Sequence, residues 1–278
     1  PEARYREDPM RMLRAVRFAA KLGFRLEDAT AAPIPRLSGL LLDISSARLY
    51  EEVLKLFMSG EAATTYEMLR QYGLFGRLFP ETEAALAEEV DGHPQILIGK
   101  ALDNTDRRID EDKPVTPAFL FAALLWPPVL RRWQATAAQM GDVPALIAAG
   151  SRVVSDQAGH TALPKRFSIP MREIWSLQPR FHELSGRRPL RLVTHPRFRA
   201  AYDFLLLRGA SGEVEQSLCD WWTDFQNEST EARERMLAAQ IERKPKKRRR
   251  RRRSGAKPDS AAPAPGEMDA TDASGSEE

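Results

Sequence analysis

Apolar residues recur with a helical period along most of residues 1–242. Leu49, Val53, Leu56 and Phe57 lie three or four positions apart, which puts them on one face of a helix spanning about Ser46 to Met58. We find no sustained alternation of apolar and polar residues with a period of two, which argues against a large sheet. The pattern therefore predicts an all-α fold. Further helical patterns fall at Ala62, Tyr66, Leu69 and Tyr72; Ile174, Leu177, Phe181 and Leu184; Phe198, Tyr202, Leu205 and Leu206; and Val214, Leu218, Trp221, Trp222 and Phe225.

The composition changes sharply after residue 242. Residues 243–257 carry 11 Lys and Arg and no acid, whereas residues 258–278 carry 6 Asp and Glu and no base. Residues 1–242 hold 31 basic and 33 acidic side chains, so they are close to neutral. The last 36 residues have few large apolar side chains to offset the entropy cost of ordering, and we expect them to be disordered in the free protein.

The usual catalytic motifs are not found in the sequence. The four histidines are not in metal-ligand spacing, and the single cysteine, Cys219, lies on an apolar helix face beside Trp222. No Gly-rich phosphate loop and no Asp-x-Asp pair on a predicted strand occurs. The longest apolar run, residues 118–126, is too short to cross a bilayer. We therefore expect a cytoplasmic protein without a membrane span.

The stretch "REDPMRMLRAVRF" (6–18) combines a helix start with regularly spaced arginines. Asp favours the N-cap and Pro the first helical position, so the sequence predicts a helix beginning at Pro9 and ending near Gly23. Arg11, Arg14 and Arg17 would then share a sector of about 120°. An ordinary amphipathic helix with solvated arginines fits this spacing as well.

A functional interpretation of the same stretch rests on Asp8 and Arg11. These residues are three apart and can share one side of the first turn. A carboxylate beside a guanidinium presents an acceptor next to a donor. That pattern complements the amino group and ring nitrogen of adenine, and equally those of cytosine, while Arg14 and Arg17 can hold phosphate nearby.

The segment "EDPMRMLRAVRFAAKLGF" (7–24) resembles the start of the neck domain in class II nucleotidyltransferases, the bacterial poly(A) polymerases and CCA-adding enzymes. The resemblance makes Glu7-Asp8-x-x-Arg11 the base-reading motif. The block "ISSARLYEEVLKLF" (44–57) resembles the next neck motif, in which the arginine helps to orient the base-reading pair. The nucleotide-binding residues expected from this resemblance and from the spacing are Asp8, Arg11, Arg14, Arg48 and Glu52.

Later blocks resemble the poly(A) polymerase branch of this family, among them "PAFLFAALLWPP" (117–128), "LPKRFSIPMREIWSLQ" (163–178), "HPRFRAAYDFLLLR" (195–208) and "WWTDFQ" (221–226), as does the Arg-rich tail. The resemblance implies addition of AMP units from ATP, with Mg²⁺, to RNA 3′ ends, in a process that promotes RNA decay and can involve the RNA-degradation machinery. It divides the chain into neck helices (1–60), a helical RNA-binding body (61–242) and an Arg-rich, then acidic tail (243–278). The expected RNA-binding residues are Arg17, Arg243, Lys244, Lys246, Lys247, Arg248, Arg249, Arg250, Arg251, Arg252 and Arg253.

Two other readings stay open from the sequence. A CCA-adding tRNA nucleotidyltransferase shares the neck motifs, and a non-catalytic RNA-binding helical protein would need only the helices and the tail. In the family the neck follows a head domain that carries Gly-Ser and an Asp-x-Asp pair for two magnesium ions. Gly-Ser occurs at 150–151 and 275–276 and Asp-x-Asp at 110–112, but none of these lies on a predicted strand. We therefore expect no catalytic residue in this chain and no nucleotide transfer by it alone.

Overall fold

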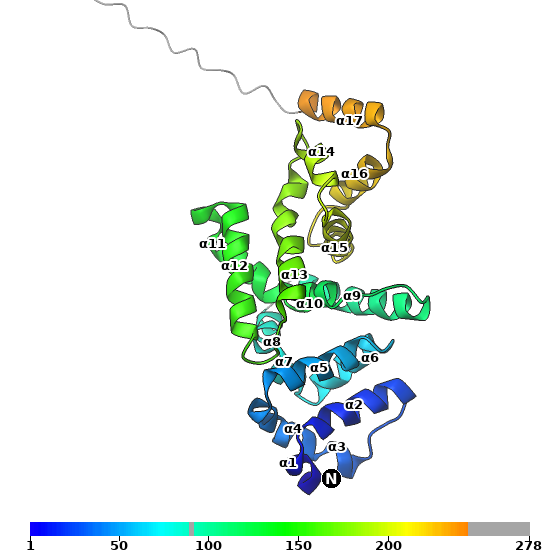
Figure 1. Cartoon of the computed structure of the whole chain (residues 1–278), viewed down its shortest axis with the longest axis vertical. Coiled ribbons are helices and arrows are strands. Elements are labelled where there is room, and N and C mark those ends of the chain that lie inside the picture. Colours follow the sequence, from blue (N-terminus) through cyan, green and yellow to red (C-terminus); the bar gives the residue numbers. More distant parts are fainter. Residues whose placement is uncertain (89–91, 244–278) are drawn as a thin grey trace, which may run out of the picture. The chain divides into compact units, whose positions relative to one another are not determined.

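A computed structural model describes residues 1–88 and 92–243 of the chain (Figure 1). Within these residues every regular element is a helix, which confirms the predicted all-α fold, and Pro1–Arg243 form one compact unit. The elements are α1 (Glu2–Glu7), α2 (Met10–Leu22), α3 (Asp28–Ala31), α4 (Pro33–Leu37), η1 (Ser38–Asp43, a 3₁₀ helix), α5 (Ser46–Phe57), α6 (Ala62–Gln71), α7 (Phe75–Leu78), α8 (Pro80–Ala87), α9 (His93–Asp110), α10 (Pro117–Leu124), α11 (Trp126–Met140), α12 (Asp142–Gln157), α13 (Lys165–Leu177), η2 (Gln178–His182, a 3₁₀ helix), α14 (Arg188–Val193), α15 (Phe198–Ala210), α16 (Gln216–Asn227) and α17 (Thr230–Arg243).

Helix α2 begins one residue later than the sequence predicts. It starts at Met10, and the Asp8 carboxylate accepts the Met10 backbone N–H at 3.3 Å, so Asp8 still satisfies one of the free donors at the helix start. The end agrees with the prediction: Gly23 adopts φ 62°, and the Phe24 N–H returns to the Ala19 carbonyl at 2.9 Å. The short helix α1 in front of this turn was not predicted.

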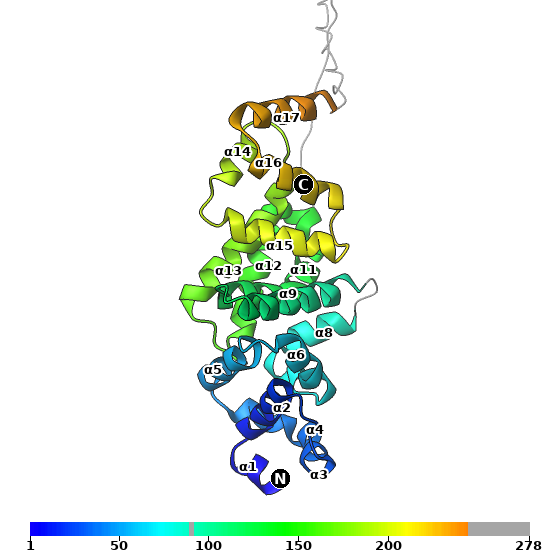
Figure 2. The same ribbon diagram turned by 90° about the vertical axis from the view of Figure 1, so that its right-hand side faces the viewer.

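The first helices pack around α2. Its neighbours are α1, α5 and α6, and α6 in turn packs against α9 (Figures 1 and 2). The carboxylate of Asp106, on α9, accepts the backbone N–H groups of Ala62 at 2.7 Å and Ala63 at 3.0 Å, which start α6. A side chain 43 residues away therefore caps α6, and this contact fixes α9 against α6.

The central helix of the following region is α13. It packs against α10, α12 and α15, while α11 and α12 form a closely packed pair that lies side by side in Figure 1. Pro127 and Pro128 end the apolar run predicted from the sequence and also occupy the start of α11, where a missing N–H removes no helical hydrogen bond. The predicted helical pattern from Ile174 to Leu184 divides instead into α13 and η2.

Two hydrophobic clusters hold the helices together. The first takes residues from Tyr5 to Leu207, and the second takes residues from Leu177 to Leu237. Helices α13 and α15 contribute side chains to both. Because the first cluster includes residues on both sides of residue 60, the expected neck and body share one core, and the division between them stays a prediction.

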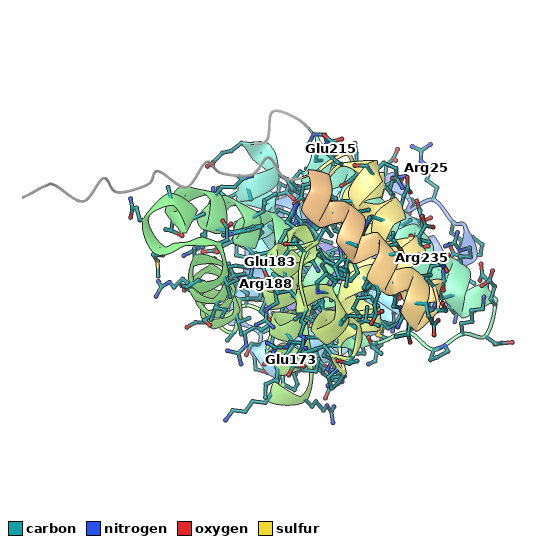
Figure 3. All side chains as sticks on the ribbon, turned by 90° about the horizontal axis from the view of Figure 1, so that it is seen from above. Arg25, Glu173, Glu183, Arg188, Glu215 and Arg235 are labelled. Carbon is teal, nitrogen blue, oxygen red and sulfur yellow. The ribbon has the colours of Figure 1, made fainter. Side chains whose placement is uncertain are left out.

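Figure 3 shows two ion pairs on the outside of the helices. Glu183 and Arg188, which are neighbours in Figure 3, form an ion pair at 3.2 Å. Arg25 extends away from the ribbon in the same view and pairs with Asp28 at 3.3 Å. The expected tail lies outside the described residues from Lys244 onward, and Arg243 is the last residue of α17.

Candidate nucleotide- and RNA-binding surface

Asp8 is the centre of a small charged cluster at the start of α2. Its Oδ2 atom lies 3.5 Å from Arg14 Nη1, and its Oδ1 atom lies 3.9 Å from Arg48 Nη2 on α5. The second distance brings Arg48 within reach of Asp8, and its expected role in orienting the base-reading pair stays a prediction. Because both contacts are long and the carboxylate is partly exposed, Asp8 keeps accepting capacity for a ligand.

Arg11 lies on the first turn of the same helix and is exposed. Within the described part of the chain it forms no ion pair, so Arg14 and not Arg11 is the partner of Asp8. The expectation that Asp8 and Arg11 read a base together concerns a bound ligand and stays a prediction. The arrangement leaves the Arg11 guanidinium available to an external acceptor.

Glu52 and Arg17 form a second cluster between α2 and α5. The Glu52 side chain is 2% exposed, and its two oxygens lie 3.4 Å from Arg17 Nε and 3.7 Å from Lys55 Nζ. A buried carboxylate needs such partners, because removing them would leave an uncompensated charge. In this conformation Glu52 therefore positions Arg17 and faces no solvent, and the expected ligand contacts of both residues stay predictions.

A groove of about 1010 Å³ lies between α9, the 111–116 loop, α10 and α15. Sequence reasoning missed it because its walls come from segments almost 100 residues apart. Burial raises the pKa of the Asp203 carboxyl in this groove, and Arg199 opposes that rise. The groove carries more bases than acids; its basic side chains are Lys100, Arg107, Arg108, Lys113, Arg197 and Arg199. The sequence holds two signals that could have indicated this basic groove: the adjacent pair Arg107-Arg108 and the segment "HPRFR" (195–199).

A magnesium site is not apparent in the described part of the chain. There, no three His, Cys, Asp or Glu side chains gather closely enough to hold a metal ion. The carboxylates closest to the candidate surface, Asp8 and Glu52, are already paired with arginine or lysine. These residues do not fit the Mg²⁺ that the resemblance to class II nucleotidyltransferases implies. Among the same described residues, no helix is long and apolar enough to cross a membrane.

Comparison with known proteins gives two family matches. Residues 138–255 match the polymerase A arginine-rich C-terminus, and residues 23–86 match the probable RNA- and SrmB-binding site of polymerase A. The first match extends into the Arg-rich run, and the second contains α5 with Arg48 and Glu52.

Poly(A) polymerases I are similar to the chain over most of its length. That of Escherichia coli O157:H7 is 46% identical over 244 residues, covering 85% of this chain and 52% of the relative. That of Haemophilus influenzae is 39% identical over 249 residues, covering 88% and 55%. The CC-adding tRNA nucleotidyltransferase of Halalkalibacterium halodurans is 40% identical, but over only 75 residues, 27% of this chain and 20% of the relative.

The chain spans about half the length of the poly(A) polymerases that it matches. The similarity to the poly(A) polymerase of Escherichia coli O157:H7 covers 85% of this chain, whereas the similarity to the CC-adding enzyme covers 27%. The arginine-rich match at residues 138–255 assigns the chain to the C-terminal side of such a protein. The chain therefore belongs to the bacterial poly(A) polymerase family and corresponds to the C-terminal portion of its members.

Proposed function

We propose that this chain supplies base recognition and RNA binding to a polynucleotide adenylyltransferase, which adds AMP units from ATP to RNA 3′ ends. The observation that carries the proposal is the cluster at the start of α2. A partly open Asp8 carboxylate precedes an exposed Arg11 by three residues, in a chain 46% identical to a poly(A) polymerase I.

The proposed recognition follows from hydrogen-bond complementarity. Asp8, as a carboxylate, accepts from the exocyclic amino group of adenine, and Arg11 donates to the neighbouring ring nitrogen. Guanine and uracil present an acceptor where adenine presents its amino group. An acceptor on the base would then oppose the acceptor oxygens of the Asp8 carboxylate. Arg14 and Arg48 hold the Asp8 carboxylate in place from two sides.

Metal chemistry is not assigned to the described residues. Poly(A) polymerases transfer nucleotides with a divalent metal, and the carboxylates described above do not fit one. The roles proposed for this chain are therefore binding the base and holding the RNA.

A CCA-adding activity is the second candidate, because cytosine presents the same edge pattern as adenine to Asp8 and Arg11. The local match to a CC-adding enzyme, 40% identical over 75 residues, supports this second candidate. Incorporation of CTP into a tRNA primer would support it. A purely RNA-binding protein would show neither ATP nor CTP incorporation in any context.

The wider setting also belongs to this proposal. We place the protein in the cytoplasm, where its tails would mark RNA for decay and bring it to the RNA-degradation machinery. The support is the family alone, and the test is a measurement of RNA half-lives with and without the gene.

Residues 1–278 by themselves are expected to transfer no AMP. The reason is that no Asp-x-Asp pair lies on a predicted strand, since both positioned metal ions and an in-line geometry are needed for nucleotidyl transfer. The measurement is primer extension with ATP, Mg²⁺ and an RNA primer. Extension by a preparation free of host polymerase would contradict this expectation.

Arg11→Ala is expected to reduce discrimination for ATP about 5- to 150-fold, the equivalent of losing one bidentate base contact worth about 1–3 kcal/mol. The assay uses a chimera that joins this chain to the N-terminal part of the Escherichia coli O157:H7 relative, with all four nucleotides offered in competition. Asp8→Ala is a poorer test because it also removes the Met10 hydrogen bond and both arginine contacts.

Arg25→Ala is the matched control for this experiment. The Arg25 side chain is almost fully exposed, and it pairs only locally with Asp28. It should leave nucleotide choice unchanged. An Arg11→Ala chimera that folds stably and still prefers ATP as strongly as the parent would refute the base-reading role.

A further inference from the structure

Phe18 is a large aromatic residue on the outside of α2. It is 52% exposed, although the same helix buries Met12, Leu13 and Val16 completely. A single exposed apolar side chain is common on protein surfaces and needs no explanation by itself. What distinguishes Phe18 is its surroundings.

Phe18 lines a groove of about 360 Å³ between α2 and α5. The groove has three cationic side chains, an aromatic ring and an aliphatic wall, and no carboxylate lines it. The lining residues are Arg17, Phe18, Lys21, Leu54, Lys55, Met58 and Ser59. The buried Glu52 carboxylate beneath offsets one of the three charges, so the site keeps a net positive charge.

The ring of Phe18 is held in place from one side. The guanidinium carbon of Arg17 lies 4.9 Å from the ring centroid, and Arg17 is itself fixed by Glu52. A cation over one face stabilises the ring without covering it, and half of the residue stays open to a second planar group. The ring of Phe18 can therefore stack with a planar group on its open face.

We infer that this groove binds one nucleotide of single-stranded RNA, with the base stacked on Phe18 and the flanking phosphates on Lys21 and Lys55. The inference rests on the proposed RNA-binding function and adds a specific contact to it. Base stacking on an aromatic ring tolerates any sequence, because every base has a π-face, and a positively charged groove follows the backbone. The site would hold the RNA strand without reading it.

The position of the groove is consistent with a strand that runs along α2. Arg11 and Phe18 are seven residues apart, so they lie on nearly the same face of the helix and about 10 Å apart along its axis. Both are exposed. A strand held at Phe18 would thus lie next to the first-turn cluster around Asp8.

A protein segment is the competing occupant of this surface. Leu22 and Phe24 are also exposed, at 54% and 65%, and could extend an apolar interface. Three cations without a lining carboxylate favour a polyanion over an apolar protein surface, which would have to desolvate each of them. The experiment below separates the two.

The test is photocrosslinking of the full chain to a single-stranded RNA that carries 5-iodouridine at scattered positions, followed by tryptic mapping. Trypsin cuts after Arg17 and Lys21, so a base stacked on Phe18 labels the peptide "FAAK" (18–21). Phe24 provides the matched control within the same digest, because it lies in the separate peptide "LGFR" (22–25). We expect label on the first peptide and not on the second.

Affinity measurements on variants complete the test. Phe18→Leu should weaken RNA binding at raised salt, where the tail contributes least, by about 5- to 150-fold, and Phe18→Trp should retain it. Lys21→Gln should lower the salt slope of binding by about 0.7. Lys21 is the better choice than Lys55, whose loss would also disturb Glu52.

The outcomes distinguish this inference from the proposed function. If the parent chain binds RNA but labels only other peptides, and Phe18→Leu binds as tightly as the parent, the stacking site is wrong and the groove serves a protein contact. If the parent chain binds no RNA, the proposed function itself fails. Melting temperatures of all variants check that the exposed substitutions leave the fold intact.

Discussion

Arg208→Ala is expected to lower the free energy of unfolding by about 3–5 kcal/mol, the usual cost of leaving one charge of a buried pair without its partner. Arg208 is 4% exposed, and its Nε atom lies 2.9 Å from the Glu213 carboxylate, which is 8% exposed. Without the guanidinium, Glu213 would stay inside the protein as an unpaired charge or take up a proton at a free-energy cost.

Arg208 also connects several distant parts of the fold. Its Nη1 donates to Gln178 Oε1 at 3.1 Å, and its guanidinium lies over the rings of Trp126 and Trp133 at 5.1 and 5.9 Å. The Glu213 carboxylate accepts from Trp126 Nε1 at 2.8 Å. Gln178 lies where the two hydrophobic clusters meet, and its Nε2 donates to the carbonyls of α13 and α15.

Chemical denaturation measures the effect, with Arg199→Ala as the control on the same helix. Arg199 forms an exposed ion pair with Asp203 at 3.1 Å, and exposed pairs contribute about 0–1 kcal/mol. The double variant Arg208→Met, Glu213→Leu removes both charges together and should recover much of the stability. A loss below about 1 kcal/mol for Arg208→Ala would mean that water reaches Glu213 easily, contrary to its burial.

The elements that the sequence predicted best depend on neighbouring residues. Asp8 and Gly23 mark the ends of α2 because a cap and a left-handed turn are local requirements, satisfied within a few residues. Helices α5 and α6 were predicted from the spacing of apolar residues alone. Their observed bounds agree with the predicted ones to within a residue or two.

Contacts between distant segments were not predictable from such signals. Trp126 and Glu213 are 87 residues apart, and the cap that Asp106 provides to α6 spans more than 40 residues. Neither contact produces a periodic pattern of residues in the sequence, because each depends on how whole helices pack against one another. The contact of Arg48 with Asp8 was expected only through the family resemblance, and the ion pair of Asp8 with Arg14 was not predicted.

The same distinction applies to the candidate RNA surface. The charge run at residues 243–253 is evident from composition, whereas the groove with Lys100 and Arg197 requires α9 and α15 to be adjacent. Sequence reasoning therefore assigned most of the RNA affinity to the tail, and the structure adds a second basic surface on the helical unit. The relative contribution of the two surfaces can be measured.

Deleting residues 243–257 is expected to reduce the salt dependence of RNA binding strongly. Residues 243–253 hold 10 positive charges in 11 positions, broken only by Pro245. For single strands the logarithm of affinity falls with the logarithm of salt concentration by about 0.7 for each phosphate neutralised. If about half of the charges engage RNA, the slope should fall in magnitude by about 3 to 4.

The deletion should weaken binding to all RNA sequences alike, because contacts from arginine to phosphate carry no base information. Its melting temperature should stay close to that of the parent, since both hydrophobic clusters are built from residues between Tyr5 and Leu237. Deleting the acidic residues 258–278 instead is the matched control, and it should strengthen binding if those 6 acids compete with RNA for the arginines.

Titrations with one RNA at several salt concentrations decide between the two basic surfaces. A slope that falls as expected assigns most of the phosphate contacts to the tail and leaves Phe18 and the helical grooves to place the strand. An equal slope in both proteins would instead assign the contacts to the helical unit. In that case Lys100→Gln and Arg107→Gln, two exposed cations of α9 that form no ion pair within the described residues, should each lower the slope by about 0.7.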